Sequence, residues 1–320
     1  MAADRTAEGA VATATAAATG AAAPRRRPLQ PHGRATPYLL AAPALLLYGA
    51  FLLFPLARAV QYSLYDFDGL TVGTFVGLDN YVAVVADEGL RQAFGHALVL
   101  VLFFSVIPVV VGLALAALLT RAPVRGLPAF RTVVFLPQVI AMVVVAVAWR
   151  RIYAPDGPLN TALRAVGLDG LARTWLGDFG TALPAVGLIG TWVSTGLATV
   201  LLMAGMARVP RELYEASSLD GAGPVRQLVA ITLPSVRPEM AVALVLTTIT
   251  ALKTFDLVYV TTGGGPGTST TVPSYEVYRR AFELGQVGSA AAVGVVLTVL
   301  VLLVTVVVTR VVDPSRRDER

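Results

Sequence analysis

The chain has 320 residues, of which 56% are hydrophobic and only 14% charged, and its mean hydropathy is +0.70. Soluble domains typically carry about 25% charged residues, so this composition excludes an ordinary soluble domain and indicates a polytopic membrane protein. The net charge of +5 does not indicate a nucleic-acid partner, because the basic residues gather at the ends of apolar runs, where they set membrane orientation.

The first 37 residues are rich in Ala, Thr, Gly, Pro and Arg and show neither a helical nor a strand period. Such a composition is typical of a disordered segment. A signal peptide is the alternative, but its polar region would be too long, and the apolar run that follows is long enough to span a bilayer. We therefore expect a disordered cytoplasmic tail over residues 1–37 and no cleavage.

Six apolar runs follow, each near the ~20 residues that cross the hydrocarbon core. Their continuous rather than alternating pattern favours helices over a barrel. They cover roughly residues 38–62, 97–120, 132–150, 183–206, 239–261 and 288–311. We therefore expect an all-α membrane protein with a six-helix transmembrane domain over residues 38–312 and a cytoplasmic C-terminal tail over 313–320. Prolines 43, 55, 108 and 137 lie inside these runs, where neighbouring helices can satisfy the carbonyls they free.

Arginines predict the orientation, because cytoplasmic segments carry an excess of basic residues. With the N-terminus inside, 16 arginines fall in inside segments: Arg5, Arg25, Arg26, Arg27, Arg34, Arg121, Arg125, Arg131, Arg208, Arg211, Arg226, Arg237, Arg310, Arg316, Arg317 and Arg320. Only 7 fall in outside segments: Arg91, Arg150, Arg151, Arg164, Arg173, Arg279 and Arg280. Both termini are therefore expected in the cytoplasm, together with the segment 207–237 between the fourth and fifth runs.

This cytoplasmic segment, which we call the insert (residues 207–237), has the pattern of two short helices. Pro210 suits the first turn of a helix, and Glu212 and Glu215 in its first turns suit the helix dipole. Gly221 can form a left-handed C-terminal cap, after which Pro224 begins a second helix. Two helices of this size cannot form a core of their own, so the insert must pack on the chain's other loops, on the membrane surface or on a partner.

The insert resembles the cytoplasmic coupling signature of binding-protein-dependent ABC importer permeases. That signature is Glu-Ala-Ala, three residues, Gly, nine residues, Ile, one residue and Leu-Pro. The matching positions, at the same spacing, are Glu215, Ala216, Ser217, Gly221, Ile231, Leu233 and Pro234. Ser217 in place of Ala is the one departure. The resemblance implies that these residues, with Asp220, dock into a groove on an ATPase subunit, where Glu215 meets a basic group.

A second resemblance narrows the family. The stretch "FDLVYVTTGGGPGTSTTVPSYEVYRRAF" (255–282) is similar to the fifth span and outer loop of sugar permeases of the maltose or glycerol-3-phosphate type. "FVGLDNYVAVVAD" (75–87) and "FLPQVIAMVVVAVAWRRIY" (135–153) add further matches. Gly263, Gly264, Gly265 and Pro266 are expected to form a tight outer loop. It is either a plain connector, or a surface for the binding protein or a lid on the pathway.

The sequence lacks the residues that several kinds of functional site require. A P-loop requires Gly-Lys-Ser/Thr, and the single lysine, Lys253, follows Leu252. Energy must therefore come from another chain. The absence of cysteine excludes disulfides and thiolate metal sites, and His32 and His96 have no ligand partners near them in sequence. We therefore expect no enzyme, no cofactor and no metal in this chain.

A solute pathway requires polar groups that face the interior of the helix bundle. Hydroxyl groups with an aromatic ring suit a sugar, and two runs offer them; the alternative is that these hydroxyls bond their own helix. The candidate pathway residues are Thr191, Trp192, Ser194 and Thr195 in the fourth run and Thr247, Thr250, Lys253, Thr254 and Asp256 in the fifth. A lysine near mid-span needs a partner or water, so we expect Lys253 to pair with Asp256 or to act as a gate.

Taken with the resemblance, these features imply the permease subunit of an ATP-driven sugar importer in the bacterial plasma membrane. The implied partners are a second, homologous permease in a heterodimer, two ATPase subunits that hold ATP-Mg, an extracytoplasmic solute-binding protein and membrane lipid. One alternative is an ABC permease for a non-sugar solute. Another is an ion-coupled secondary transporter, which predicts several intramembrane acids, whereas Asp256 is the only clear one. An intramembrane enzyme lacks His/Asp/Glu clusters in the spans.

Overall fold

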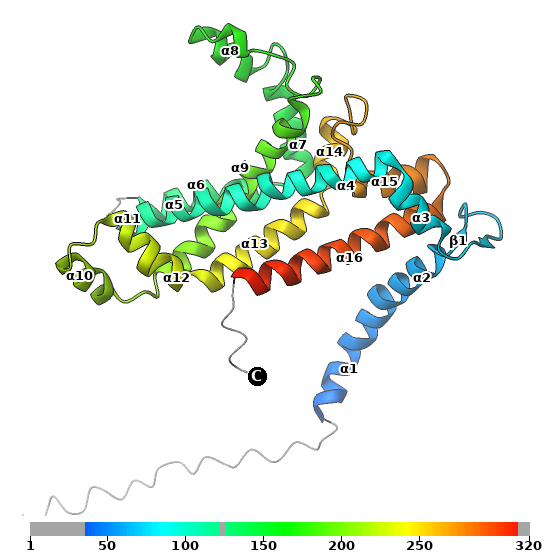
Figure 1. The fold of residues 1–320 in the computed structure, drawn as a ribbon, viewed down its shortest axis with the longest axis horizontal. Helices are drawn as coiled ribbons and strands as arrows, with labels where there is room; N and C mark the ends of the chain where they lie inside the picture. Colours follow the sequence, from blue (N-terminus) through cyan, green and yellow to red (C-terminus); the bar gives the residue numbers. More distant parts are fainter. Residues whose placement is uncertain (1–35, 122–125, 313–320) are drawn as a thin grey trace, which may run out of the picture. The chain divides into compact units, whose positions relative to one another are not determined.

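The computed structural model describes residues 36–121 and 126–312 (Figure 1). All but two residues of the expected tail 1–37, and the whole of 313–320, lie outside the described residues, as does Arg125. The chain divides into two units, residues 1–55 and 56–320. Helices dominate the described residues of both units. The strands that the structure describes form one antiparallel hairpin of β1 (Tyr65–Asp66) with β2 (Thr74–Phe75), in which Tyr65 opposes Phe75 and Asp66 opposes Thr74. The expected all-α fold class is therefore confirmed.

The first apolar run forms a helix from Tyr38 to Tyr62. It consists of α1 (Thr36–Tyr48), a π turn over Gly49–Leu53, and α2 (Phe54–Tyr62). Its large apolar side chains are exposed, among them Leu40, Leu46 and Phe51. A helix that is apolar all round is typical of a membrane span.

The remaining elements follow in chain order. They are α3 (Asp79–Ala86), α4 (Glu88–Val101), a π turn (Leu102–Val106), α5 (Ile107–Arg121), α6 (Leu127–Val139), α7 (Met142–Ile152), α8 (Pro158–Ala165), a 3₁₀ turn (Asp169–Leu171), α9 (Ala182–Met206), α10 (Arg211–Leu219), α11 (Pro224–Gln227), a π turn (Leu228–Thr232), α12 (Leu233–Ser235), α13 (Arg237–Leu252), α14 (Asp256–Thr261), α15 (Pro273–Tyr278), a π turn (Arg279–Glu283) and α16 (Val287–Val312).

Four of the described helices are long and apolar enough to cross a membrane, and two bent helix pairs raise that number to as many as six. The four are Tyr38–Tyr62, Glu88–Thr120, Ala182–Met206 and Val287–Val312. The second of these begins at Glu88 rather than near residue 97, because one face of its charged first turns is already buried through Leu90 and Ala93. A search for uninterrupted apolar runs misses such an amphipathic beginning.

The third predicted span is not one straight helix. Its two halves, α6 and α7, meet at an angle of 97°, and Ile140 and Ala141 between them have ψ angles of 135° and 133°. Pro137 lies in the last turn of α6 and cannot donate a backbone hydrogen bond. The expectation of one straight span over 132–150 is therefore corrected: the segment forms a bent helix pair, which is either a broken span or a re-entrant loop.

The fifth predicted span is interrupted as well. α13 ends at Leu252 and α14 begins at Asp256, so Lys253, Thr254 and Phe255 form a break inside the run 239–261. A helix break leaves backbone groups without intrahelical partners, which membrane proteins tolerate where the segment is buried in protein or lines a cavity. Lys253 thus lies at a break and not in the middle of a helix.

At three other prolines the helix continues without a break. The π turns Gly49–Leu53, Leu102–Val106 and Leu228–Thr232 each end two residues before a proline, namely Pro55, Pro108 and Pro234. Proline lacks an N–H and its ring crowds the carbonyl four residues earlier. A widened turn accommodates that carbonyl and lets the helix continue.

The second unit is built around α9, which packs on α5, α6 and α13 (Figure 1). Glycines make this packing close: a Cβ at Gly190 would overlap the ring of Phe104, and one at Gly196 would overlap the backbone of Val134 in α6. Small residues allow helices in lipid to approach one another closely. α16 packs on the opposite side, along α13 and α15.

An ion cluster joins α4, α15 and α16. Arg280 donates hydrogen bonds to Asp87 at 2.8 Å and to Ser289 at 2.8 Å, and it also contacts the buried Glu276 at 3.4 Å. Asp87 is the N-cap of α4 and accepts from the backbone N–H of Leu90 at 3.1 Å. Partial burial raises the pKa of Asp87, but these two donors outweigh it and hold the pKa below its usual value.

This cluster yields a stability prediction. Asp87→Ala removes the cap and the Arg280 contact and should lower the free energy of unfolding by about 1–2 kcal/mol. Asp87→Asn keeps a capping oxygen and should cost less than half as much. Thermal unfolding of the purified protein in detergent measures both, and equal losses for the two variants would show that the cap contributes nothing.

Candidate functional site

The insert folds as two short helices joined by a left-handed turn. Pro210 is the N-cap of α10, and Asp220 is its C-cap. Gly221 follows with φ +75°, a conformation that glycine adopts at little cost. Pro224 then occupies the first turn of α11, where its missing N–H is not needed. These punctuating residues explain why so short a segment holds a defined shape.

Hydrogen bonds between side chains hold the two helices of the insert together. Gln227 donates from Nε2 to the Ser218 hydroxyl at 2.8 Å, to the Ser217 hydroxyl at 3.0 Å and to the carbonyl of Tyr214 at 3.2 Å. The hydroxyls of Tyr214 and Thr232 lie 2.9 Å apart. Sequence reasoning missed Gln227 and Tyr214, although a polar side chain facing the first helix from the second was a signal for them.

The matching residues of the coupling signature differ in exposure. Glu215, Ala216, Asp220, Gly221 and Pro234 are exposed, whereas Ser217, Ile231 and Leu233 are half-buried. Ser217 therefore supports the insert from within, consistent with its bond to Gln227. Glu215 has no hydrogen bond or ion pair with any other residue that the structure describes. The structure thus brings these residues together in one small unit.

Apolar side chains of the insert face outward. Leu219 is 90% exposed and Val225 75%, while Leu213 and Val229 are also exposed. Such exposed apolar residues beside charged ones mark a surface suited to a partner.

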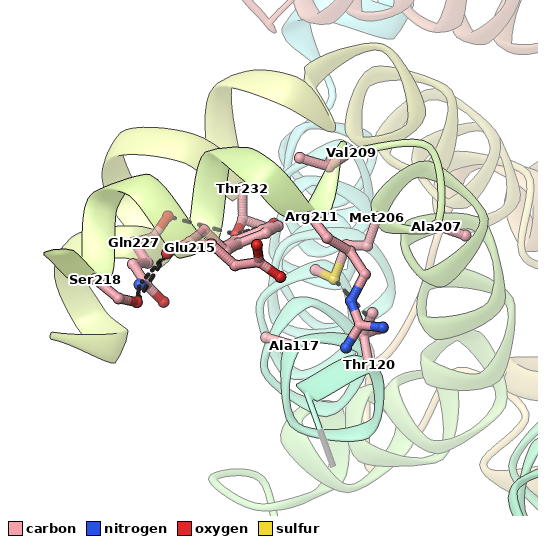
Figure 2. A pocket seen from close by; sticks show the side chains of 11 residues that line it. Ala117, Thr120, Met206, Ala207, Val209, Arg211, Glu215, Ser218, Gln227 and Thr232 are labelled. Carbon is pink, nitrogen blue, oxygen red and sulfur yellow. Dashed lines mark hydrogen bonds between the residues drawn. The ribbon is translucent and has the colours of Figure 1, made fainter. Parts of the chain in front are cut away.

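A pocket of about 640 Å³ separates α10 and the following turn from the ends of α5 and α9. The bundle contributes Ala117, Thr120 and Met206 to its wall, and the insert contributes Ala207, Val209, Arg211, Tyr214, Glu215, Ser218, Gln227 and Thr232. Figure 2 shows the charged ends of Arg211 and Glu215 at this pocket. The insert is therefore not packed tightly against the helices that carry it.

The candidate pathway residues of α9 fall into two groups. Thr191 donates to the carbonyl of Phe103 at 2.6 Å, and Thr195 donates to the carbonyl of Thr191 at 2.7 Å, so these hydroxyls satisfy helix backbone. Ser194 is buried. Trp192 is 43% exposed and its ring lies 5.7 Å from that of Trp149, between ring centroids. Trp192 is thus the pathway candidate of α9 with a free ring face.

The fifth run divides in the same way. Thr247 is buried and donates to Ser105 at 2.8 Å, and Thr254 is buried as well. Thr250, Lys253 and Asp256 are exposed at and beside the helix break. The expected ion pair between Lys253 and Asp256 does not form, and among the described residues neither side chain enters an ion pair. Of the five candidates in this run, Thr247 and Thr254 are therefore buried, whereas the other three are exposed.

Several hydrogen bonds hold the outer loop. Gly263 and Gly264 have φ angles of +57° and +85°. The hydroxyl groups of Thr262 and Thr270 form a hydrogen bond of 2.7 Å, and the Thr270 hydroxyl donates to the carbonyl of Gly265 at 2.8 Å. The ring Nδ1 of His96 donates to the carbonyl of Thr271 at 2.9 Å, which ties the loop to α4. A tightly bonded loop of this kind presents a fixed surface, with Gly265 and Pro266 at its turn.

Comparisons with known proteins agree with this architecture. Residues 97–318 match the family described as "Binding-protein-dependent transport system inner membrane component". The chain is similar to the probable ABC transporter permease protein YurN of Bacillus subtilis (strain 168), with 39% identity over 83% of this chain and 92% of the relative. It is also similar to the trehalose/maltose transport system permease protein MalF of Thermococcus litoralis, with 33% identity over 88% of this chain and 94% of the relative.

A solved structure shares the fold. It is a bacterial ABC transporter involved in the import of the acidic polysaccharide alginate, which matches with a TM-score of 0.72 and 24% identity over 88% of this chain and 95% of that chain. A helical bundle of apolar spans, a polar two-helix insert between α9 and α13 and this set of relatives all lead to one conclusion. The chain belongs to the family of inner membrane components of binding-protein-dependent transport systems.

Proposed function

We propose that this chain is the membrane-spanning permease subunit of an ATP-driven importer for a sugar or sugar-like solute. The observation that carries the proposal is the exposed face of the insert, where Glu215 and apolar side chains are presented without a partner from the described residues. The chain has no Gly-Lys-Ser/Thr P-loop, so two ATPase subunits supply the energy and meet the insert in the cytoplasm. A second, homologous permease completes the pathway.

The mechanism is alternating access. ATP binding closes the ATPase subunits, which displaces the insert, and the helices attached to it open the bundle toward an extracytoplasmic binding protein. The outer loop around Gly264 offers that protein a fixed surface. Both termini and the insert then face the cytoplasm, as the arginine distribution favours.

The solute class follows from the relatives and from the exposed pathway residues. Relatives carry names that refer to diacetylchitobiose, sulfoquinovosyl glycerol, trehalose/maltose and sn-glycerol-3-phosphate, all of which are rich in hydroxyl groups. Trp192 offers a ring face for stacking, and Thr250 offers a hydroxyl. Lys253, exposed at the helix break, suits a solute that also bears an anionic group.

Charge reversal at Glu215 tests the coupling role. Glu215→Arg should weaken association with the ATPase subunits by ~2–5 kcal/mol, the usual cost of removing one partner of a buried charge pair. Co-purification of the ATPase subunits and binding-protein-stimulated ATP hydrolysis in nanodiscs measure this effect. Glu212→Arg, a reversal one turn earlier on the same helix, is the matched control. Undiminished association of the Glu215→Arg variant would contradict the proposal, and solute movement without any ATPase would replace it with a secondary transporter.

The exposed and buried threonines of α13 should behave differently. Thr250→Val should raise the KM of transport without lowering stability, because its hydroxyl reaches only the carbonyl of Leu246 at 3.0 Å. Thr247→Val removes the bond to Ser105 and should lower the free energy of unfolding by about 0.5–1.5 kcal/mol. Uptake of radiolabelled trehalose, maltose, diacetylchitobiose and sn-glycerol 3-phosphate into proteoliposomes measures the first effect. If Thr250→Val leaves the KM of the transported solute unchanged, Thr250 does not belong to the pathway.

A further inference from the structure

An ion pair closes the base of the insert, at the point where it leaves the helix bundle and returns to it. Arg208 lies just after the end of α9, and Glu239 lies in the first turn of α13. The guanidinium of Arg208 pairs with Oε1 of Glu239. The pair thus links the first residues of the insert to the first residues after it.

Glu239 is an unusual partner because its carboxylate is buried. The side chain of Glu239 is only 13% exposed, whereas that of Arg208 is 72% exposed. The second oxygen, Oε2, is buried and has no hydrogen-bond partner among the described residues. A buried carboxylate with one unsatisfied oxygen is costly. A surface pair that served solubility alone would not require this burial.

The position of the Glu239 side chain requires a glycine at residue 205. A Cβ built on Gly205 would lie 2.8 Å from Oε2 and 2.9 Å from Cδ of Glu239. Any larger residue at this point of α9 must therefore displace the carboxylate of Glu239 from its present position. Three residues connect the end of α9 to the start of α13: Gly205, Arg208 and Glu239. We call them the base clasp.

Open space separates much of the insert from the helix bundle. The pocket of about 640 Å³ separates α10 from the ends of α5 and α9, and a second pocket of about 410 Å³ borders the clasp itself. The segment Pro224–Ser235 meets α13 at an angle of 73°, with the buried Val236 at the corner. Because the insert stands apart from the bundle elsewhere, its base is the place where displacement can pass to the helices.

We propose that the Arg208–Glu239 pair fixes the insert to α9 and α13 together, so that both helices follow when the insert is displaced. Arg208 and Glu239 are positioning residues of the coupling step, and neither touches solute. This inference rests on the proposed function, because it needs an ATPase that displaces the insert. It assigns a role to two charged residues that the coupling signature does not include.

The test measures whether the insert and α13 move as one body. The chain contains no cysteine, so Glu212→Cys and Val242→Cys, both at exposed positions, place one spin label on α10 and one on α13. The labelled chain is assembled with its partner permease and the ATPase subunits in nanodiscs. Distances between the labels are measured by pulsed electron paramagnetic resonance without nucleotide and after trapping with ATP and vanadate.

With the clasp intact, the distance between the labels should stay the same in both states. In Arg208→Gln and Glu239→Gln, trapping should shift the mean distance by at least about 2 Å, the size of helix displacements in switching proteins, and broaden its distribution. Gly205→Ala should do the same without altering any charge, whereas Arg208→Lys, which keeps the charge, should match the parent. Gln variants that match the parent in both states, in complexes with a full complement of ATPase subunits, would overturn the inference.

The two proposals fail in different ways. Loss of the clasp should leave co-purification of the ATPase subunits unchanged, because it does not alter the exposed face of α10. If the Glu215→Arg variant retains its ATPase subunits, the proposed coupling role of the insert fails, and the clasp inference that rests on it fails too. If that variant loses its ATPase subunits but the Gln variants of the clasp match the parent, the clasp inference alone fails. If Glu239→Gln does not fold, Arg208→Gln carries the test alone, because the side chain of Arg208 is largely exposed and its replacement leaves no cavity.

Discussion

The requirement that every backbone N–H and C=O be paired inside hydrocarbon governs this structure. Each proline in an apolar run removes one donor, and the chain meets that loss in two ways. Before Pro55, Pro108 and Pro234 a π turn keeps the helix continuous. Near Pro137 the helix ends and a new one begins at 97°. These departures from straight helices therefore follow from where prolines fall, whereas the break at Lys253–Phe255 contains no proline.

The same requirement explains why polar residues gather at the interruptions. A straight apolar helix offers only its side chains, whereas a break exposes backbone and places polar residues beside it. Lys253 lies at the break between α13 and α14, next to the exposed Thr250 and Asp256. The insert is the largest interruption, and it keeps its shape through the bonds of Gln227 rather than through a core.

Packing around α9 connects these regions. Its glycines let Phe104 and the backbone of α6 approach closely, and Gly205 in its last turn leaves room for the side chain of Glu239. One rigid helix therefore runs from the candidate pathway at Trp192 to the base of the insert at Arg208. An assembly that converts movement at one end into opening at the other requires such a stiff element.

Much of this protein followed from residue order alone. Continuous apolar runs predicted the all-helical class, and Pro210, Gly221 and Pro224 predicted the two-helix insert, because these signals act within a few neighbouring residues. The runs 132–150 and 239–261 did not show their breaks, since hydropathy measures composition and not direction.

The candidate pathway residues also show a feature that residue order alone did not predict. Periodicity grouped Thr247, Thr250 and Thr254, but packing buried the first and the last and left Thr250 exposed. The ion pair of Arg208 with Glu239 joins the two ends of the insert, which are distant in sequence. Only the tertiary structure decides such features, because they depend on which helix faces which, and that is settled by close approach at glycines and by the burial of charges.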